Sequence, residues 1–131
     1  MRKLNTSDVF KMARIIKKAK VAEAIEQIFT SSRENPIIIK EDDSEEVKAE
    51  KNREIERKKE AAGFRTIMTI FESCSTEELE NMLYQFLGGI TEKNPEDVSK
   101  QSLEATINDI KQIVKENNIA DFFKQADQLT K

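Results

Sequence analysis

Apolar side chains recur at helical spacing along most of the chain, and the stripes that they form predict where the helices lie. The first stripe follows the polar run 5–8, whose side chains can accept hydrogen bonds from free amide groups, with Asp8 also favourable to the helix dipole. The members of this stripe are Val9, Met12, Ala13 and Ile16, with Phe10 at its border. These positions predict a helix over residues 6–18.

The lysine-rich run 17–20 interrupts this stripe and predicts a bend near Ala19. A second helical stripe follows, made of Val21, Ile25, Ile28 and Phe29. Pro36 ends this unit, because proline disfavours helical geometry in the residue before it and has no amide hydrogen to donate. The three consecutive isoleucines 37–39 then favour either a short strand or a cover over a hydrophobic edge.

Residues 40–60 are rich in both acidic and basic side chains, and Val47 and Ile55 are their only large apolar ones. Pairs such as Glu54 and Lys58, four residues apart, would each stabilise a helix by about 0.2–0.5 kcal/mol. We therefore expect a solvated helix, and a mobile, disordered insertion is the alternative. The segment would also suit a charged handle for a partner, although runs of mixed sign are more often solvated faces.

Helical periodicity returns after this segment in two further stripes. The first consists of Phe64, Ile67, Met68 and Phe71, on a helix that could continue from the charged segment. The run 75–78 reads as a capping box opened by Ser75, and it precedes a stripe over residues 79–87. Gly88 and Gly89 are expected to end that helix, because glycine tolerates left-handed backbone geometry.

Two more helices are predicted before the terminal one. Asn94 would cap a short helix that starts at Pro95, a residue common in the first helical turn. Gln101 or Ser102 would then begin a longer helix, which ends at the asparagines 117–118. The stripe of that longer helix is Leu103, Ile107, Ile110 and Val114.

The last fifteen residues carry apolar side chains almost to the end of the chain. Ile119, Phe122, Phe123, Ala126 and Leu129 recur at helical spacing. Successive helical side chains point about 100° apart, so two adjacent phenylalanines cannot both point straight inward. We expect a broad apolar face that either the core or a partner covers.

Because each of these elements is helical, the sequence predicts an all-α fold, a compact multi-helix domain spanning residues 1–131 with six or seven helices. The charged residues 40–60 would form a partly solvated central helix or linker within it.

The amino-acid composition excludes several kinds of catalytic and metal-binding site. The chain has no histidine, so Ser-His-Asp and Cys-His catalytic arrangements cannot exist, and the commonest zinc ligand is missing. The acids of 41–46 lack the ligand pattern of an EF-hand, and capping and solvation explain them better. Cys74, the single cysteine, could be a reactive thiol but is more often a small buried side chain. We predict a non-enzymatic protein with no cofactor and no metal.

Charge and hydropathy indicate which kinds of partner the protein binds. Acidic and basic residues nearly cancel to a net charge of −3, so there is no strong field to attract nucleic acid. No apolar run approaches the roughly 18 residues of a membrane span. With one cysteine and no secretory apolar segment, these features predict a soluble protein of a reducing cytoplasm that binds other proteins, with neither nucleic acid nor membrane as a partner.

Both ends of the chain resemble the small tail assembly chaperones of siphophages that infect Gram-positive bacteria. The opening runs that carry the resemblance are Lys3-Leu4-Asn5-Thr6-Ser7-Asp8-Val9-Phe10 and Ala13-Arg14-Ile15-Ile16-Lys17-Lys18. The later ones are residues 79–87, Thr91, Asn94-Pro95-Glu96-Asp97-Val98, residues 103–114 and Asn118-Ile119-Ala120-Asp121-Phe122-Phe123. The charged residues 40–60 depart from the family pattern, since they are longer and more polar than a short connection between helices.

The resemblance implies a chaperone that coats the helix-rich tape measure protein in the cytoplasm of the infected host and is absent from the finished virion. It also implies self-association into rings or arrays, replacement by tail tube protein, and a longer frameshifted form of the same chain as an additional partner. As a hypothesis from the terminal apolar faces, the contact residues are Phe10, Phe122, Phe123 and Leu129, although burial in the core is the more frequent fate of each. The alternative function is a small helical regulatory protein that binds a host or phage protein.

Overall fold

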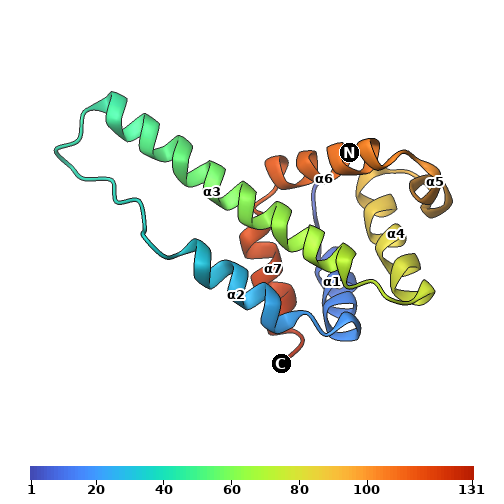
Figure 1. Ribbon diagram of the computed structural model, residues 1–131. Helices are drawn as coiled ribbons and strands as arrows, with labels where there is room; N and C mark the ends of the chain where they lie inside the picture. The colour runs from blue at the N-terminus through green and yellow to red at the C-terminus, as the bar shows by residue number, and fades with distance from the viewer.

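The computed structural model describes all residues 1–131 and contains seven helices and no strand, which confirms the all-α prediction. The helices run in chain order as α1 (Thr6–Ala19), α2 (Ala22–Ser32), α3 (Glu45–Glu72), α4 (Glu77–Thr91), α5 (Pro95–Lys100), α6 (Leu103–Glu116) and α7 (Ile119–Gln128). Figure 1 shows their arrangement, in which α3 is the long diagonal element and the two chain ends lie on opposite sides of the body. None of the helices combines the length and the apolar composition needed to cross a bilayer.

The predicted bend near Ala19 is present as the break between α1 and α2. Lys20 adopts left-handed backbone geometry, with φ of 59°, and its amide donates to the carbonyl of Ile16. Helix α2 then continues until Ser32, ahead of Pro36. The strand proposed for the isoleucines 37–39 is wrong: they lie in an extended connection between α2 and α3, where no other segment offers them a strand partner.

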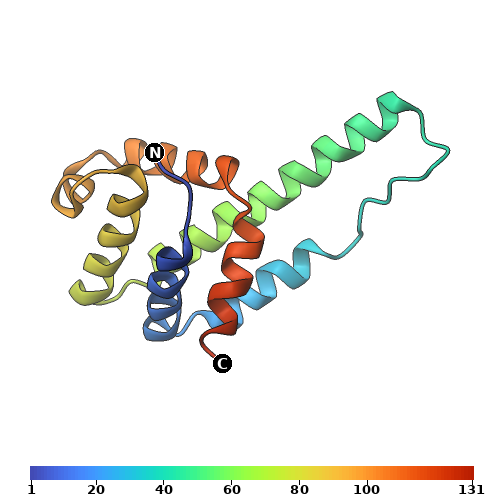
Figure 2. The ribbon, with the colours of Figure 1, turned by 180° about the vertical axis from the view of Figure 1, so that it is seen from behind.

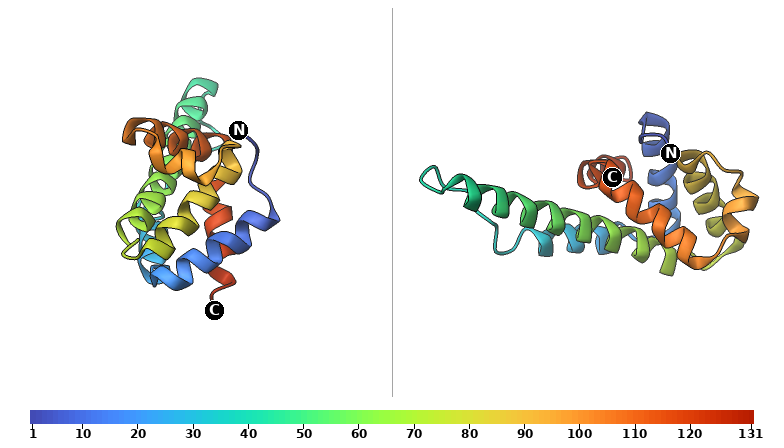
Figure 3. Two further views of the ribbon diagram at one scale, coloured as in Figure 1. Left: turned by 90° about the vertical axis from the view of Figure 1, so that its right-hand side faces the viewer. Right: turned by 90° about the horizontal axis from the view of Figure 1, so that it is seen from above.

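The charged segment is helical from Glu45 onward and continues without interruption into the apolar stripe that follows it, giving the 28 residues of α3. The hydroxyl of Ser44 caps this helix by accepting a hydrogen bond from the amide of Val47. Only the second half of α3 contributes to the core, through residues such as Ile67 and Ile70. The first half projects from the body together with the extended connection, as the right panel of Figure 3 shows.

Helix α4 corrects two expectations about its ends. Its cap is Thr76 and not Ser75, because the Thr76 hydroxyl is the group that accepts from the amide of Leu79. The glycine pair does not end the helix, which continues to Thr91 and stops where Glu92 takes left-handed geometry, with φ of 61°. Gly88 has a different use: a Cβ there would lie 2.7 Å from the carbonyl oxygen of Lys93, so glycine lets the following loop fold back closely.

The starts of α5 and α6 lie where the sequence predicted them. Asn94 precedes α5, although its side chain makes no capping hydrogen bond, and the Ser102 hydroxyl caps α6 by accepting from the amide of Ala105. The predicted stripe of α6 is partly wrong. Leu103 is 70% exposed, whereas Ile113, which the stripe omitted, is fully buried. Leu103 lies on the solvent side of the first turn of α6, whereas Thr106 in the same turn is buried.

Helix α7 packs its apolar face into the core, and this packing determines where the two adjacent phenylalanines lie. The Phe122 ring packs toward α4, with its centroid 5.9 Å from that of Phe86, and the Phe123 ring packs toward α2, 6.5 Å from Phe29. Both phenylalanines are buried, because α7 lies between α1 on one side and α2 and α3 on the other (Figure 2). The protein's own core therefore covers most of the terminal apolar face.

Candidate partner-binding site

An open groove runs between α1 and α7 and is lined by residues from the first and the last parts of the chain. Its volume is about 640 Å³. Its apolar lining consists of Leu4, Val9, Phe10, Phe122 and Leu129. Figure 2 shows the elements that form it, with the N-terminal segment passing beside α7.

The N-terminal segment is fixed beside this groove by hydrogen bonds to distant parts of the chain. The amide of Arg2 donates to the carbonyl of Ile90 at 3.0 Å, and the amide of Leu4 donates to the side-chain oxygen of Asn117 at 3.1 Å. The Lys3 ammonium donates to the carbonyl of Glu116 at 2.6 Å. These bonds place Leu4 at the junction of α6 and α7, so the groove has a defined wall.

The first turn of α1 is held by an ion pair that the capping prediction did not include. Asn5 and Asp8 form a capping box, and the Arg2 guanidinium donates to both oxygens of the Asp8 carboxylate, at 2.6 and 2.9 Å. Burial by itself would raise the pKa of Asp8. The hydrogen bonds from Arg2 and the Asn5 amide, with the positive charges of Arg2 and Lys11, outweigh burial and hold that pKa below its usual value.

The structure separates the four predicted contact residues. Phe10 and Leu129 are 50% and 51% exposed and lie on the groove, one from each end of the chain. Phe122 also lines the groove but is buried, so it forms part of the floor. Phe123 is fully buried on the other side of α7 and contributes nothing to this groove.

The polar lining of the groove is almost uncharged. It consists of Asn5, Thr6, Asn117, Asn118, Gln125 and Gln128, with Asp121 as the single ionisable residue. Amide and hydroxyl groups can donate or accept hydrogen bonds at the edge of an apolar contact without the desolvation cost of a buried charge. The groove is thus suited to an apolar side chain or helix face.

Leu4 was absent from the predicted site, although the sequence does contain a signal for it. An apolar residue just before an N-cap often packs against one at the fourth helical position, and Leu4 and Val9 hold those two places around the Asn5 cap. Both of them line the groove. The role of Arg2 has no comparable local signature, because its backbone is positioned by Ile90, far along the chain.

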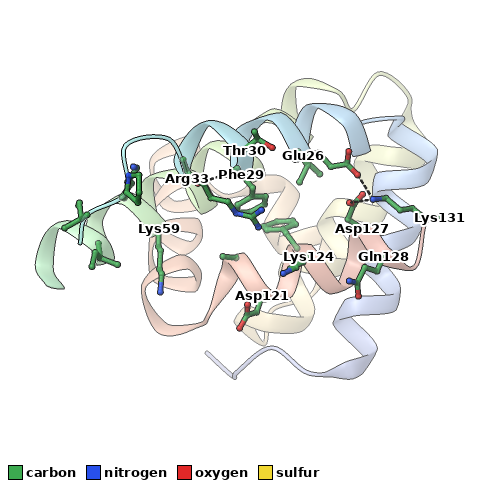
Figure 4. Close-up of a pocket in the computed structure, with 18 residues that line it drawn as sticks. Glu26, Phe29, Thr30, Arg33, Lys59, Asp121, Lys124, Asp127, Gln128 and Lys131 are labelled. Atoms are coloured by element: carbon green, nitrogen blue, oxygen red, sulfur yellow. Dashed lines mark hydrogen bonds and ion pairs between the residues drawn. The ribbon is translucent and has the colours of Figure 1, made fainter. Parts of the chain in front are cut away.

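A second hollow lies on the opposite side of α7, between α2, α3 and α7, and we refer to it as the cleft. Its volume is about 610 Å³, and Ile25, Phe29 and Phe123 contribute to its apolar lining. Figure 4 shows two basic side chains, Arg33 and Lys59, toward one end of the cleft and a group of three charged residues at the other end. Lys124 lies between that end and the group.

That group consists of Glu26, Asp127 and Lys131. The Lys131 ammonium lies 2.8 Å from a Glu26 carboxylate oxygen and 3.7 Å from one of Asp127. Burial raises the pKa of Asp127, and the neighbouring Glu26 raises it further. The hydrogen bond from Lys131 lowers the pKa of Glu26. One carboxylate oxygen of Asp127, Oδ1, is buried without a hydrogen-bond partner.

Cys74 has the surroundings of a structural cysteine. Its thiol is partly buried at the end of α3 and donates to the carbonyl of Ile70 at 3.2 Å. Burial, with a smaller effect from the charge of Glu80, raises the pKa of this thiol. The neutral thiol is therefore the form that this environment favours, which is unfavourable for a nucleophile.

Comparison with known proteins assigns no function to the groove or to the cleft. No protein-family model, no curated protein and no solved structure matches this chain.

Proposed function

We propose that this protein is a tail assembly chaperone that binds the tape measure protein through the groove between α1 and α7. Two grounds support this proposal: the family resemblance of the terminal segments and one observation on the structure. Phe10 and Leu129 expose half of their surface on a groove whose floor includes Phe122. Exposed apolar side chains grouped around a hollow are typical of a protein interaction site.

The occupant of the groove would be the apolar face of a helix. Amphipathic helices bind in grooves by inserting side chains spaced three or four residues apart, and the nearly uncharged lining here does not require a charged partner. A tape measure protein exposes many such faces along its length. A hollow of about 640 Å³ accommodates only a few side chains from each of them.

Small contacts of this kind suit a chaperone that must later leave. Interfaces below about 1,200 Å² of buried surface are characteristic of weak and transient complexes. Many copies would mask the tape measure in the host cytoplasm without chemical catalysis, until tail tube protein replaces them. The same mechanism leaves the chaperone out of the finished virion, and a longer frameshifted form could occupy some of the positions.

The test is co-expression with the tape measure protein from the same genome, followed by measurement of tape measure solubility and co-purification. Phe10→Ser and Leu129→Ser should each weaken the complex, and the double variant should abolish co-purification, because the apolar contact is lost from both sides of the groove. Leu103→Ser is the matched control, since Leu103 is exposed but lies outside the groove. Thermal unfolding should be similar for all of these proteins.

Two outcomes would count against the proposal. If the wild-type chain leaves the tape measure insoluble and unbound, even with any longer form of the chain present, the chaperone function is wrong and a regulatory partner should be sought. If binding occurs but the double variant binds as well as the Leu103 control, the groove is not the contact surface.

A further inference from the structure

The side chain of Asp127 is buried near the end of α7 and lacks the hydrogen bonds that a buried carboxylate requires. The residue is 8% exposed, and its Oδ1 atom has no hydrogen-bond partner. Its Oδ2 atom lies 3.7 Å from the Lys131 ammonium, too far for a strong hydrogen bond. A carboxylate ion in these surroundings is unfavourable, because burial removes water from its charge and no donor replaces that water.

Glu26 of α2 lies beside Asp127 and offers a carboxylate that can accept a hydrogen bond. The Lys131 ammonium lies 2.8 Å from a Glu26 oxygen, so the positive charge is paired mainly with Glu26 (Figure 4). A hydrogen bond between two carboxyl groups requires a proton on one of them, because an ionised carboxylate only accepts. Asp127 is favoured to hold this proton, since it is the more buried of the two and Lys131 stabilises the charge of Glu26.

The surroundings of Asp127 favour a proton over any larger partner for its Oδ1 atom. This atom has almost no surface open to solvent, so a ligand or a cation held in the cleft could not contact it. Glu26 and Lys131 are the two charged groups that act on the pKa of Asp127. The remaining charged residues of the cleft are Arg33, Lys58, Lys59, Asp121 and Lys124, from α2, α3 and α7, and no residue of α1 lines it.

We propose that Asp127 keeps its proton in the folded chain and donates it in a hydrogen bond from Oδ1 to the Glu26 carboxylate, which makes the pair a latch between the end of α7 and α2. The negative charge that remains on Glu26 is balanced by the Lys131 ammonium. When the pH rises, the proton passes to water and Asp127 becomes a buried anion beside a second carboxylate. Desolvation and like-charge repulsion then oppose the contact, and the latch opens.

The latch makes the chain less stable as the pH rises. Burial and the neighbouring Glu26 raise the pKa of Asp127 above its ordinary value of 3.8, so its stabilising effect is complete below 3.8 and is lost as the pH rises through the folded value. The pKa of Glu26 is lowered from 4.5, so its own contribution is lost only as the pH falls below 4.5. The chain has no histidine, and the fold lowers the pKa of Asp8 and of Asp43. A loss of stability between pH 4.5 and pH 7 would therefore come from Asp127.

Opening of the latch would also affect the groove on the other side of α7. Leu129, which lies on that groove, caps the end of α7 between Asp127 and Lys131. Release of this end would move Leu129, and binding of the tape measure should weaken as the pH rises. This consequence rests on the proposed function, whereas the latch itself does not. The experiment uses the chain alone, so the failure of one proposal is distinguishable from the failure of the other.

The experiment measures urea unfolding of the full chain at intervals from pH 4.5 to pH 7. The folding equilibrium constant of the wild type should fall by up to about tenfold per pH unit, until the folded pKa of Asp127 is passed. Asp127→Asn should remove this dependence and be the more stable protein at pH 7, because its amide donates to Glu26 without titrating. Asp42→Asn, at an exposed aspartate of the connection between α2 and α3, is the matched control and should follow the wild type.

A second measurement observes the proton directly in the wild type. Carbon-13 NMR of the Asp127 carboxyl group should give a titration midpoint above the ordinary value of 3.8, and Glu26→Gln should lower that midpoint, because the glutamine amide donates to the ionised Asp127. A wild-type midpoint at or below 3.8 would overturn the proposal, even if Asp127→Asn fails to fold. So would a wild type whose stability does not fall between pH 4.5 and pH 7, or an Asp127→Asn variant that shows the same fall.

Discussion

Gly63 in α3 and Ile119 at the start of α7 lie so close together that a Cβ on Gly63 would be 2.1 Å from Cγ2 of Ile119. Two carbon atoms cannot come this close without a bond. Helices α3 and α7 can therefore meet in this way only because Gly63 has no side chain. The contact fixes where α7 begins against α3. It thereby helps to determine the positions of both the groove and the cleft, which lie on the two sides of α7.

Gly63→Ala should therefore destabilise the protein, although alanine is the better helix former. Overpacking a filled core costs about 1–3 kcal/mol. This cost exceeds the stability that a helix gains when alanine replaces glycine. A double-mutant cycle with Ile119→Ala, measured by urea unfolding, should show that the two losses are less than additive, because removing Cγ2 makes room for the new methyl group. Strict additivity would show that the two residues do not compete for this space.

Replacing Phe123 should destabilise the fold far more than replacing Phe10. Phe123→Ala should lower the free energy of unfolding by about 3–5 kcal/mol, because its fully buried ring fills the space between α7 and α2. Phe10→Ala should change it by less than about 1 kcal/mol, since half of the ring is already in solvent. Chemical denaturation of both variants at one pH is sufficient, and equal losses would contradict the burial described for these rings.

The Arg2–Asp8 pair predicts a specific dependence of stability on pH. The folded pKa of Asp8 is lowered, so its contribution is complete above the unfolded value of about 3.9 and is lost as the pH falls through the folded value. Asp8→Asn should cost about 1–3 kcal/mol at pH 7. Urea unfolding from pH 7 to pH 2 should show the difference between wild type and variant shrinking at the acidic end, and a constant difference would argue against the ion pair.

Helix α6 offers a matched pair of apolar residues with opposite burial. Ile113→Ala should cost about 2–5 kcal/mol, because Ile113 is fully buried, whereas Leu103→Ala should be within about 0.5 kcal/mol of the wild type. Thermal unfolding of the two variants tests this directly. A large loss from Leu103→Ala would mean that something covers its side chain in solution.

Cys74 should react slowly with thiol reagents. Burial raises its pKa, and its thiol donates to the carbonyl of Ile70, so the thiolate is scarce near neutral pH. Alkylation by iodoacetamide at pH 8 should be slower for the folded chain than for the same chain unfolded in urea. Equal rates would show that the folded environment does not protect this thiol.

Local patterns predicted the helices well but not all of their ends. The cap at Ser102 and the break near Ala19 depend on neighbouring residues and are where the sequence placed them. The glycine pair 88–89 was misread as a helix end, because glycine is also used where another segment approaches closely. Ser75 and Thr76 are chemically similar, and a shift of one residue between them is beyond what local preference distinguishes.

The candidate site was only partly accessible to sequence reasoning. Phe10 and Leu129 were selected as apolar residues near the two ends, yet nothing in their spacing indicated that α1 and α7 lie side by side. Phe122 and Phe123 were expected to form a broad apolar face that either the core or a partner would cover, and both are buried in the core because other helices pack against α7 on two sides. The ion pair of Glu26 with Lys131 likewise joins residues that lie far apart in the chain.

The sequence by itself determined the all-α class, the approximate helix positions and the charged character of α3, because these follow from side chains within one or two helical turns of each other. Only the tertiary structure decided which apolar residues are buried, that the first half of α3 projects from the body, and that α7 separates a nearly neutral groove from a cleft lined by both acidic and basic residues. Those properties depend on which helices meet, and the energy of such contacts comes from residues far apart in the chain, whose proximity no local pattern encodes.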